Sequence, residues 1–248
     1  MSLHAHEQRP SDERSRVAGV IFDIDGTLTK TNELIFASFN HVAEKYVGRR
    51  YTPPEIIAMF GPPEEGALAQ IVGDEAVGAA MDDLCRYYRE HHGRLAGLHP
   101  GMQEMLADLR THGVILAVFT GKGRRTTLIT LEALGIDGYF DMIVSGSDLD
   151  RHKPDPEGIR RVLEQFGLPA AEVLMVGDSA GDVTAARGAG VTSVAVLWDS
   201  YDPERVLRAS PDRVFYRVED LASWFRTSVR FTLHPARRQG DSQQRERP

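Results

Sequence analysis

The feature that most constrains the fold is a regular alternation of short apolar runs with amphipathic helical patterns. Continuous rather than alternating hydrophobicity is typical of strands buried on both faces, as in a parallel sheet. Between these runs, apolar residues recur at helical spacing, for example over residues 102–109. The alternation predicts an α/β fold, a Rossmann-like doubly wound parallel sheet. The runs that we assign to strands cover residues 17–22, 114–119, 142–144, 173–176 and 193–197.

One interval breaks this alternation and divides the chain. Residues 31–97 carry helical faces without a convincing strand pattern, and they are too many for a simple strand-to-helix crossover. We therefore predict an inserted α-helical cap at residues 31–97, within an α/β core made of residues 17–30 and 98–225. Residues 1–16 and the basic segment 226–248 lack hydrophobic periodicity, and we predict that both are flexible tails.

Composition excludes several classes of protein. The 248 residues carry a net charge of −7, which argues against nucleic acid as the main partner. Cys85 is the single cysteine, so the chain has no internal disulfide and no CxxC zinc site. No apolar run approaches the roughly 18 residues of a membrane span, and the first residues do not resemble a signal peptide. We expect a cytoplasmic protein without a membrane partner.

Polar residues follow the first two apolar runs, at the strand ends where open α/β sheets hold their reactive groups. Asp23 and Asp25 follow the first run. One can act as a nucleophile or metal ligand and the other as an acid or base, although a lone Asp-Gly turn is commonplace. Thr120 and Gly121 follow the second run. A hydroxyl and free amides ahead of a helix can cradle an anion, or can simply cap a turn.

The third and fourth runs are followed by groups of complementary charge. Lys153 precedes a helix that begins at a proline, where it can neutralise an anion or remain an ordinary solvated lysine. Asp178 and Asp182 are spaced to approach one hard cation, unless one of them is only a helix N-cap. Each loop alone is weak evidence. Together they predict a Mg²⁺-dependent phosphoryl-transfer site, because four crowded acids repel strongly without a cation.

Taken in order, these motifs resemble the four motifs of the haloacid dehalogenase-like (HAD) hydrolase superfamily. The resemblance is carried by DIDGT at 23–27, Thr120, Lys153 within KPDP, and GDSAGD at 177–182, and it spans about residues 17–222. The helical insertion is similar in position to the cap of the subfamily that contains phosphoglycolate phosphatase, β-phosphoglucomutase and pyrophosphatase-like members. The resemblance implies a phosphatase.

The resemblance also implies roles for particular residues. Asp23 would attack phosphorus to form an aspartyl phosphate, and Asp25 would protonate the leaving group and then deprotonate the hydrolytic water. Thr120 and the amide of Gly121 would bind phosphate oxygens, while Lys153 would hold Asp23 and the phosphoryl charge.

The same resemblance implies a set of Mg²⁺ ligands. They would be Asp23, the carbonyl of Asp25, and Asp178, with Asp182 steadying Lys153 or metal-bound water. Such a division of labour suits phosphoryl transfer, which depends mostly on positioning and charge neutralisation.

We therefore expect a phosphoric monoester hydrolase that acts on a small phosphorylated metabolite, as a monomer or homodimer. Lys30 stands where many phosphoglycolate-phosphatase-like members have an acid, and TGKG at 120–123 departs from the commoner forms of that loop, so the substrate stays open. Residues 60–65 are either substrate contacts or a plain turn between helices. A mutase or a pyrophosphatase on the same fold remains an alternative.

A remote alternative comes from residues 177–181, a G-x-S-x-G sequence after a strand. It would make Ser179 the nucleophile of a serine hydrolase. Such an enzyme needs a histidine further along the chain, and the one available is His234, in the polar tail. The histidines at positions 91, 92, 99, 112 and 152 show no metal-ligand spacing, and we expect them on the surface or in turns.

Overall fold

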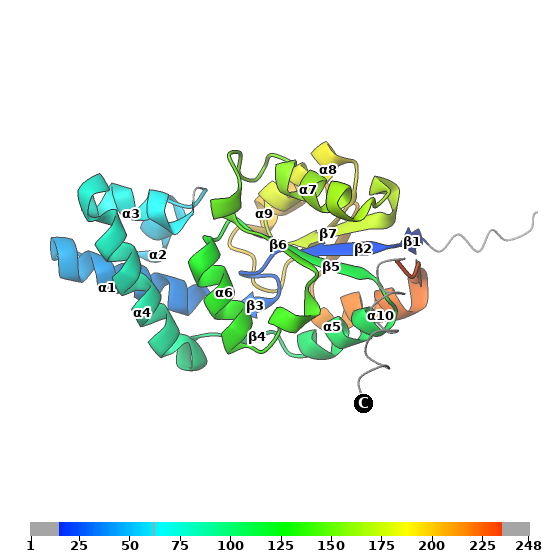
Figure 1. Ribbon diagram of the computed structural model, residues 1–248, viewed down its shortest axis with the longest axis horizontal. Helices are drawn as coiled ribbons and strands as arrows, with labels where there is room; N and C mark the ends of the chain where they lie inside the picture. The colour runs from blue at the N-terminus through cyan, green and yellow to red at the C-terminus, as the bar shows by residue number, and fades with distance from the viewer. Residues whose placement is uncertain (1–14, 62, 235–248) are drawn as a thin grey trace, which may run out of the picture.

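A six-stranded parallel sheet forms the centre of the protein (Figure 1), seen in a computed structural model that describes residues 15–61 and 63–234. The strand order is β6-β5-β2-β7-β8-β9, in which every neighbouring pair is parallel. This confirms the predicted doubly wound α/β fold. The strands are β2 (Gly19–Phe22), β5 (Ile115–Phe119), β6 (Met142–Val144), β7 (Val173–Gly177), β8 (Thr192–Val196) and β9 (Arg213–Phe215).

Helices cover both faces of the sheet because successive strand residues point to opposite sides. Val20 and Phe22 are buried in one apolar cluster with residues of α5 (Met102–Thr111) and α10 (Val218–Ser228). Ile21, between them, is buried in a second cluster with residues of α7 (Glu157–Phe166) and α8 (Ala180–Ala189). Figure 1 shows these two pairs of helices on opposite sides of the sheet.

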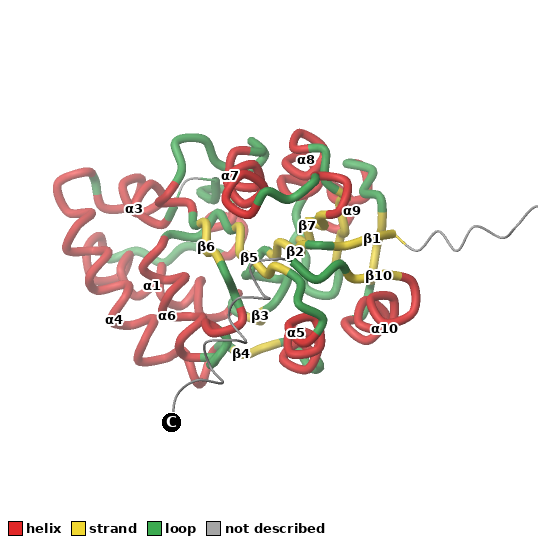
Figure 2. The backbone as a smooth tube through the Cα atoms, turned by 45° about the vertical axis from the view of Figure 1, so that its right-hand side comes forward, coloured by secondary structure: helices red, strands yellow, loops and turns green. Residues whose placement is uncertain are grey.

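The helices between residues 31 and 97 pack around an apolar cluster of their own, to one side of the sheet (Figure 2). Among the described core residues, Ile129 of α6 (Arg124–Ala133) joins this cluster. The short antiparallel strands β3 (Thr29–Lys30) and β4 (Gly97–Leu98) hold the two connections to the core side by side. The cap boundaries at residues 31 and 97 stay a prediction. The cap helices are α1 (Asn32–Val47), α2 (Pro53–Ile57), α3 (Glu64–Val72) and α4 (Val77–Leu95).

The predicted tails were too long at both ends. Strand β1 (Ser15–Val17) pairs with β10 (Val229–Phe231) in a separate two-stranded sheet, and α10 runs on to Ser228. Neither of these two strands has a hydrophobic pattern that would predict a strand from its own sequence. The remainder of both predicted tails, residues 1–14 and 235–248, lies outside the described residues.

The remaining elements are short. Helix α9 (Pro203–Arg208) lies between β8 and β9 in the chain. None of the helices in the described ranges combines the length and apolarity needed to cross a membrane. The 3₁₀ turns are Asp74–Ala76, Asp137–Tyr139, Gly146–Asp148 and Ala170–Glu172.

Candidate active site

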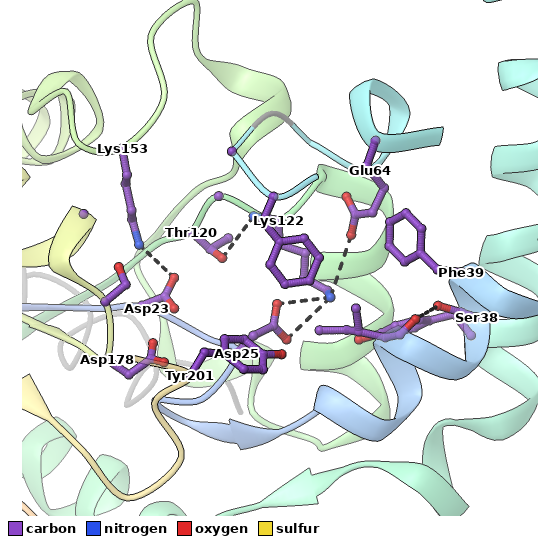
Figure 3. Close-up of a pocket in the computed structure, with 18 of the residues that line it drawn as sticks. Asp23, Asp25, Ser38, Phe39, Glu64, Thr120, Lys122, Lys153, Asp178 and Tyr201 are labelled. Atoms are coloured by element: carbon purple, nitrogen blue, oxygen red, sulfur yellow. Dashed lines mark hydrogen bonds and ion pairs between the residues drawn. The ribbon is translucent and has the colours of Figure 1, made fainter. Parts of the chain in front are cut away.

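The carboxyl ends of β2, β5 and β7 open into a cavity of about 300 Å³ between the sheet and the cap helices (Figure 3). Parallel strands place their carboxyl ends at one edge, so residues far apart in the sequence meet there. The structure brings together every residue that we predicted for the site, with Asp182 reaching it through Lys153. The predicted residues that line the cavity are Asp23, Asp25, Thr120, Gly121, Lys153 and Asp178.

Asp23 directly follows strand β2. It lies at the floor of the cavity, by which we mean the end formed at the carboxyl ends of the strands. Its amide donates to the carbonyl of Val176 at 2.9 Å, which continues the sheet pairing and fixes its backbone. Lys153 Nζ donates to Asp23 Oδ1 at 2.8 Å. Burial raises the pKa of Asp23 to about 6 despite the opposing charge of Lys153, and the nearby Asp182 adds to the rise.

Lys153 is held in the site by three neighbours. Besides Asp23, its Nζ lies 2.5 Å from Asp182 Oδ1 and 4.7 Å from the centre of the Phe119 ring. Burial alone would lower the pKa of Lys153, but the two carboxylates outweigh it and raise that pKa above its usual range. Lys153 is therefore a fixed positive charge beside Asp23 rather than a solvated lysine.

Three buried carboxylates converge beside this lysine. Asp23, Asp178 and Asp182 each offer an oxygen, and these oxygens lie within 4.8 Å of one another. Burial raises the pKa of Asp178 well above its ordinary value, and the charges of Asp23 and Asp182 raise it further. Three carboxylates against one lysine leave an excess of negative charge. An all-oxygen set of this kind fits a hard divalent cation such as Mg²⁺.

The turn after β2 brings Asp178 close because of a glycine. Gly26 has φ +79°, and a Cβ there would lie 2.5 Å from Asp178 Oδ2. Any side chain would push Asp178 away and would also be strained in this backbone conformation. Thr27 Oγ1 donates to the other Asp178 oxygen at 3.2 Å.

Asp182 belongs to the capping box at the start of α8. Ser179 Oγ donates to Asp182 Oδ2 at 2.7 Å and accepts from the Asp182 amide at 3.2 Å. Ser179 is therefore the N-cap, and the alternative that an aspartate caps this helix is wrong. The box leaves Asp182 Oδ1 free of hydrogen bonds in the described structure and aimed at Lys153.

Asp25 faces the cap and not the three-carboxylate cluster. Thr31 Oγ1 donates to Asp25 Oδ1 at 2.5 Å, and Lys122 Nζ lies 3.2 and 3.5 Å from its two oxygens (Figure 3). The predicted role of Asp25 in metal binding was through its carbonyl alone, and that role stays a prediction. Its carboxylate is placed to act on a group that enters from the cap side.

Lys122 is the site residue that our sequence reasoning missed. It is 8% exposed, and its Nζ lies 3.8 Å from Glu64 Oε1 and 4.7 Å from the Tyr88 ring centre. Burial would lower the pKa of Lys122, but Asp25, Tyr88 and Glu64 raise it above its usual range. The sequence signal was present in TGKG at 120–123, where the lysine follows the same strand as Thr120.

Glu64 connects the cap to the core. At the start of α3, it accepts the Gly123 amide at 2.5 Å and the hydroxyl of Thr126. A carboxylate at this position satisfies free donors at the N-terminus of α6. Glu64 falls within residues 60–65, which we predicted as substrate contacts or a plain turn. Phe60, Gly61 and Glu64 of this range line the cavity.

Thr120 and Gly121 occupy the loop after β5. The Thr120 side chain is buried at 2% exposure, and its hydroxyl accepts the Lys122 amide at 3.3 Å. A Cβ on Gly121 would meet nothing within 4 Å, so the backbone here is open to the cavity. This arrangement suits the predicted cradle for phosphate oxygens.

The serine hydrolase alternative fails on geometry. Ser179 is committed to capping α8, while His234 Nε2 is 2.8 Å from the carbonyl of Phe166 at the other end of the core. The expectation that the remaining histidines are surface or turn residues was wrong for His92 and His99, which are 1% and 5% exposed. His92 comes from a polar segment that hides its burial, whereas His99 follows Leu98 in a segment of small and apolar residues that could have indicated it.

Comparison with known proteins agrees with this geometry. The model of the family described as haloacid dehalogenase-like hydrolase matches residues 20–196. A protein of Caldanaerobacter subterraneus subsp. tengcongensis, provisionally named pyrophosphatase PpaX, is 35% identical over 210 residues, which cover 83% of this chain and 92% of the relative. Pyrophosphatase PpaX of Halalkalibacterium halodurans is 33% identical over 201 residues, covering 78% and 93%.

Solved structures give the same result. The crystal structure of a protein from Haemophilus somnus 129PT, described as a predicted phosphoglycolate phosphatase, has a TM-score of 0.74 and 25% identity, with 84% of this chain and 97% of that chain covered. A hydrolase from Pseudomonas syringae has a TM-score of 0.72 and 26% identity, covering 86% and 100%. This chain belongs to the haloacid dehalogenase-like hydrolase family, and it is an enzyme of the phosphatase type.

Proposed function

We propose that the protein is a Mg²⁺-dependent phosphatase that hydrolyses a small phosphorylated metabolite, a phosphomonoester, through an aspartyl phosphate on Asp23. The observation that carries this proposal is the buried Asp23 carboxylate, 2.8 Å from Lys153 and within the three-carboxylate cluster. A nucleophile, a fixed cation and a set of hard-metal ligands thus share one cavity.

The first step is attack by Asp23 on phosphorus. An oxygen of Asp23 forms a new bond to phosphorus as the bond from phosphorus to the leaving oxygen breaks. Lys153 neutralises charge on Asp23 and on the phosphoryl oxygens, while Thr120 and the Gly121 amide receive those oxygens. Mg²⁺ would be held by Asp23, the carbonyl of Asp25 and Asp178, with Asp182 steadying Lys153 or metal-bound water, and it would supply the rest of the charge neutralisation.

Asp25 serves both halves of the reaction. It gives a proton to the leaving oxygen and then takes one from the water that attacks the aspartyl phosphate, which frees phosphate and restores Asp23. Its position between the floor and the cap suits this role, because a leaving group must depart towards the cap. The cap helices above the cavity would limit the access of water.

Two alternative activities would use the same residues on the floor of the cavity. The named activity of the PpaX relatives favours pyrophosphate as a substrate, and it differs from the proposed one only in the leaving group. A phosphomutase also shares the four motifs and differs in how the cap excludes water. Both would use Asp23 as the nucleophile. They would therefore differ from the proposed activity in the substrate or water that the cap admits, and not in the attack on phosphorus.

The test uses the purified full chain with p-nitrophenyl phosphate. We expect Mg²⁺ to support turnover and EDTA to abolish it, and Asp23→Asn to lose about 10,000-fold in kcat, as removal of a catalytic nucleophile typically does. Ser179→Ala is the matched control, which costs about 1 kcal/mol of stability through the lost cap but keeps most of the activity. Activity that survives in Asp23→Asn and disappears in Ser179→Ala would contradict the proposal.

A further inference from the structure

The two ends of the cavity differ in chemistry, and the difference points to a substrate class. We propose that the site selects phosphomonoesters of uncharged, apolar alcohols over pyrophosphate and over phosphoglycolate, whose leaving groups carry negative charge. This inference rests on the proposed phosphatase function, since it concerns what leaves when Asp23 takes the phosphoryl group.

The cap end of the cavity is lined by apolar and aromatic side chains. Ile35 and Phe39 of α1 and Leu84 of α4 are buried side chains of the cap that face this space. Phe60 and Tyr201 lie at its mouth, 39% and 38% exposed, with ring centres 6.1 Å apart. An apolar leaving group would bury its surface against these residues, whereas a charged one would lose its hydration there.

Most polar atoms at this end already have a partner within the protein. Ser38 Oγ donates to the carbonyl of Ile35 at 2.8 Å, and the hydroxyl of Tyr201 donates to Asn32. Thr130 Oγ1 donates to the Tyr88 hydroxyl at 3.3 Å, and burial raises the pKa of Tyr88 to about 12, so that this ring stays neutral. The cap end therefore offers an anion few free donors.

Charge at the cap end is unfavourable for a second anion. Among the described residues that line the cavity, Lys122 and Lys153 are the cations. Lys153 is engaged by Asp23 and Asp182 on the floor. Lys122 lies between Asp25 and Glu64, at 3.2 and 3.8 Å, so its charge is already paired within the protein. The far phosphate of pyrophosphate, or the carboxylate of phosphoglycolate, would have no free cation to pair with.

This substrate class differs from the activity for which the PpaX relatives are named. At 33–35% identity, the floor residues and the fold can be shared while the cap lining differs. A 10-fold preference between substrates needs few contacts, since one methylene group in a hydrophobic pocket changes kcat/KM by about 10- to 200-fold.

The test compares phosphate release from four compounds by the full chain with Mg²⁺. Isobutyl phosphate has the shape of phosphoglycolate with the carboxylate oxygens replaced by methyl groups, so this pair isolates the charge. Benzyl phosphate and pyrophosphate complete the set. We expect kcat/KM for isobutyl and benzyl phosphate to exceed those for phosphoglycolate and pyrophosphate by about 10-fold or more.

A change of charge at the mouth sharpens the test. Phe60→Lys places a cation where the leaving group enters, and we expect it to raise the ratio of phosphoglycolate to isobutyl phosphate turnover by about 10-fold. Val47→Lys is the matched control, because Val47 is an exposed apolar residue of the cap that does not line the cavity. It should leave the ratio unchanged. Equal thermal midpoints for the variants would show that both fold.

The outcomes are distinct. Phosphoglycolate or pyrophosphate turned over as well as or better than the apolar esters overturns the substrate class but leaves the phosphatase function standing. A folded Phe60→Lys with an unchanged ratio also overturns it. If none of these compounds and no p-nitrophenyl phosphate is hydrolysed, the proposed function itself fails, and this inference fails with it.

Discussion

The floor and the cap end of the cavity each hold one buried lysine between carboxylates, yet the two regions are built differently. On the floor, Lys153 contacts Asp23, which directly follows strand β2, and Asp182, which lies in the first turn of α8 after the neighbouring strand β7. At the cap end, Lys122 bridges Asp25 of the core to Glu64 of the cap helix α3. The floor is built entirely from strands, loops and helices of the core. The cap end exists only when the cap lies against the core.

This difference assigns the chemistry and the selectivity to different parts of the molecule. The floor residues hold the same positions whatever the cap does, because β2 and β7 pair in the sheet. The Lys122 cluster would come apart if α3 moved away, since Glu64 also accepts the Gly123 amide. Removing a floor group should therefore stop the reaction, and removing a cap-end group should change how substrate is admitted.

The largest expected effect is that of Lys153→Met. It removes the cation beside Asp23 and leaves Asp182 Oδ1 buried without its opposite charge, so we expect kcat to fall about 1,000-fold. Lys122→Met is the matched variant from the other region. Its kcat/KM should fall about 10-fold, mainly through a rise in KM, as expected for a group outside the phosphoryl site. Steady-state kinetics with p-nitrophenyl phosphate measures both. Equal losses in kcat would break the distinction between the two regions.

Asp25→Asn tests the residue that lies between the regions. As the proposed general acid, Asp25 matters most when the leaving group is a poor one, so we expect about 100-fold loss for isobutyl phosphate in kcat/KM, which reports the first phosphoryl transfer and not the later hydrolysis of the aspartyl phosphate. The loss should be much smaller for p-nitrophenyl phosphate, whose leaving group needs little protonation. The ratio of the two losses is the measurement. A uniform loss for both esters would assign Asp25 to positioning or metal binding instead.

The sequence predicted the floor well because its signals are local. Asp23 and Thr120 directly follow continuously apolar runs, and Asp178 follows a third run after Gly177, so parallel pairing brings these run ends together without further information. Lys153 and Asp182 come several residues later in the chain. Gly26 and Ser179 support the floor from the same loops. The short edge strand β9 gave no such signal, because Arg213 is exposed and its neighbours are half-buried.

The cap end could not be predicted in the same way. The contact of Lys122 with Glu64 depends on how one helical layer docks on another, and no local pattern encodes that docking. The same holds for β1 and β10, which pair across nearly the whole length of the chain. Burial of His92 is also a tertiary effect, since polar neighbours surround it in the sequence.

Glu64→Gln is expected to have a smaller effect and to act at the cap end alone. An amide keeps an acceptor for the Gly123 amide but removes the charge that pairs with Lys122. We expect KM to rise about 5-fold, which corresponds to about 1 kcal/mol, the net size of one hydrogen bond, while kcat stays within 2-fold. Glu65→Gln, on the adjacent residue of α3, is the control. A fall in kcat with unchanged KM would place Glu64 in the chemical step.

The smallest effect on activity is expected at the connection that joins the two regions, where His99 follows strand β4. Burial, helped by the charge of Lys30 and opposed by a hydrogen bond with the Thr29 backbone, lowers the pKa of His99 from 6.5 to about 4. In the unfolded chain this histidine takes up a proton near its ordinary pKa, so between about pH 6.5 and 4 the unfolded state binds more protons than the folded state. The free energy of unfolding must then fall as the pH is lowered through this window. We expect His99 to contribute about 2 kcal/mol of that fall by pH 4.5. His99→Gln should flatten the profile of unfolding free energy between pH 6.5 and 4.5, measured by urea denaturation, and should run parallel to the wild type above pH 7. Parallel profiles over the whole range would mean that the connection between floor and cap opens to water in solution.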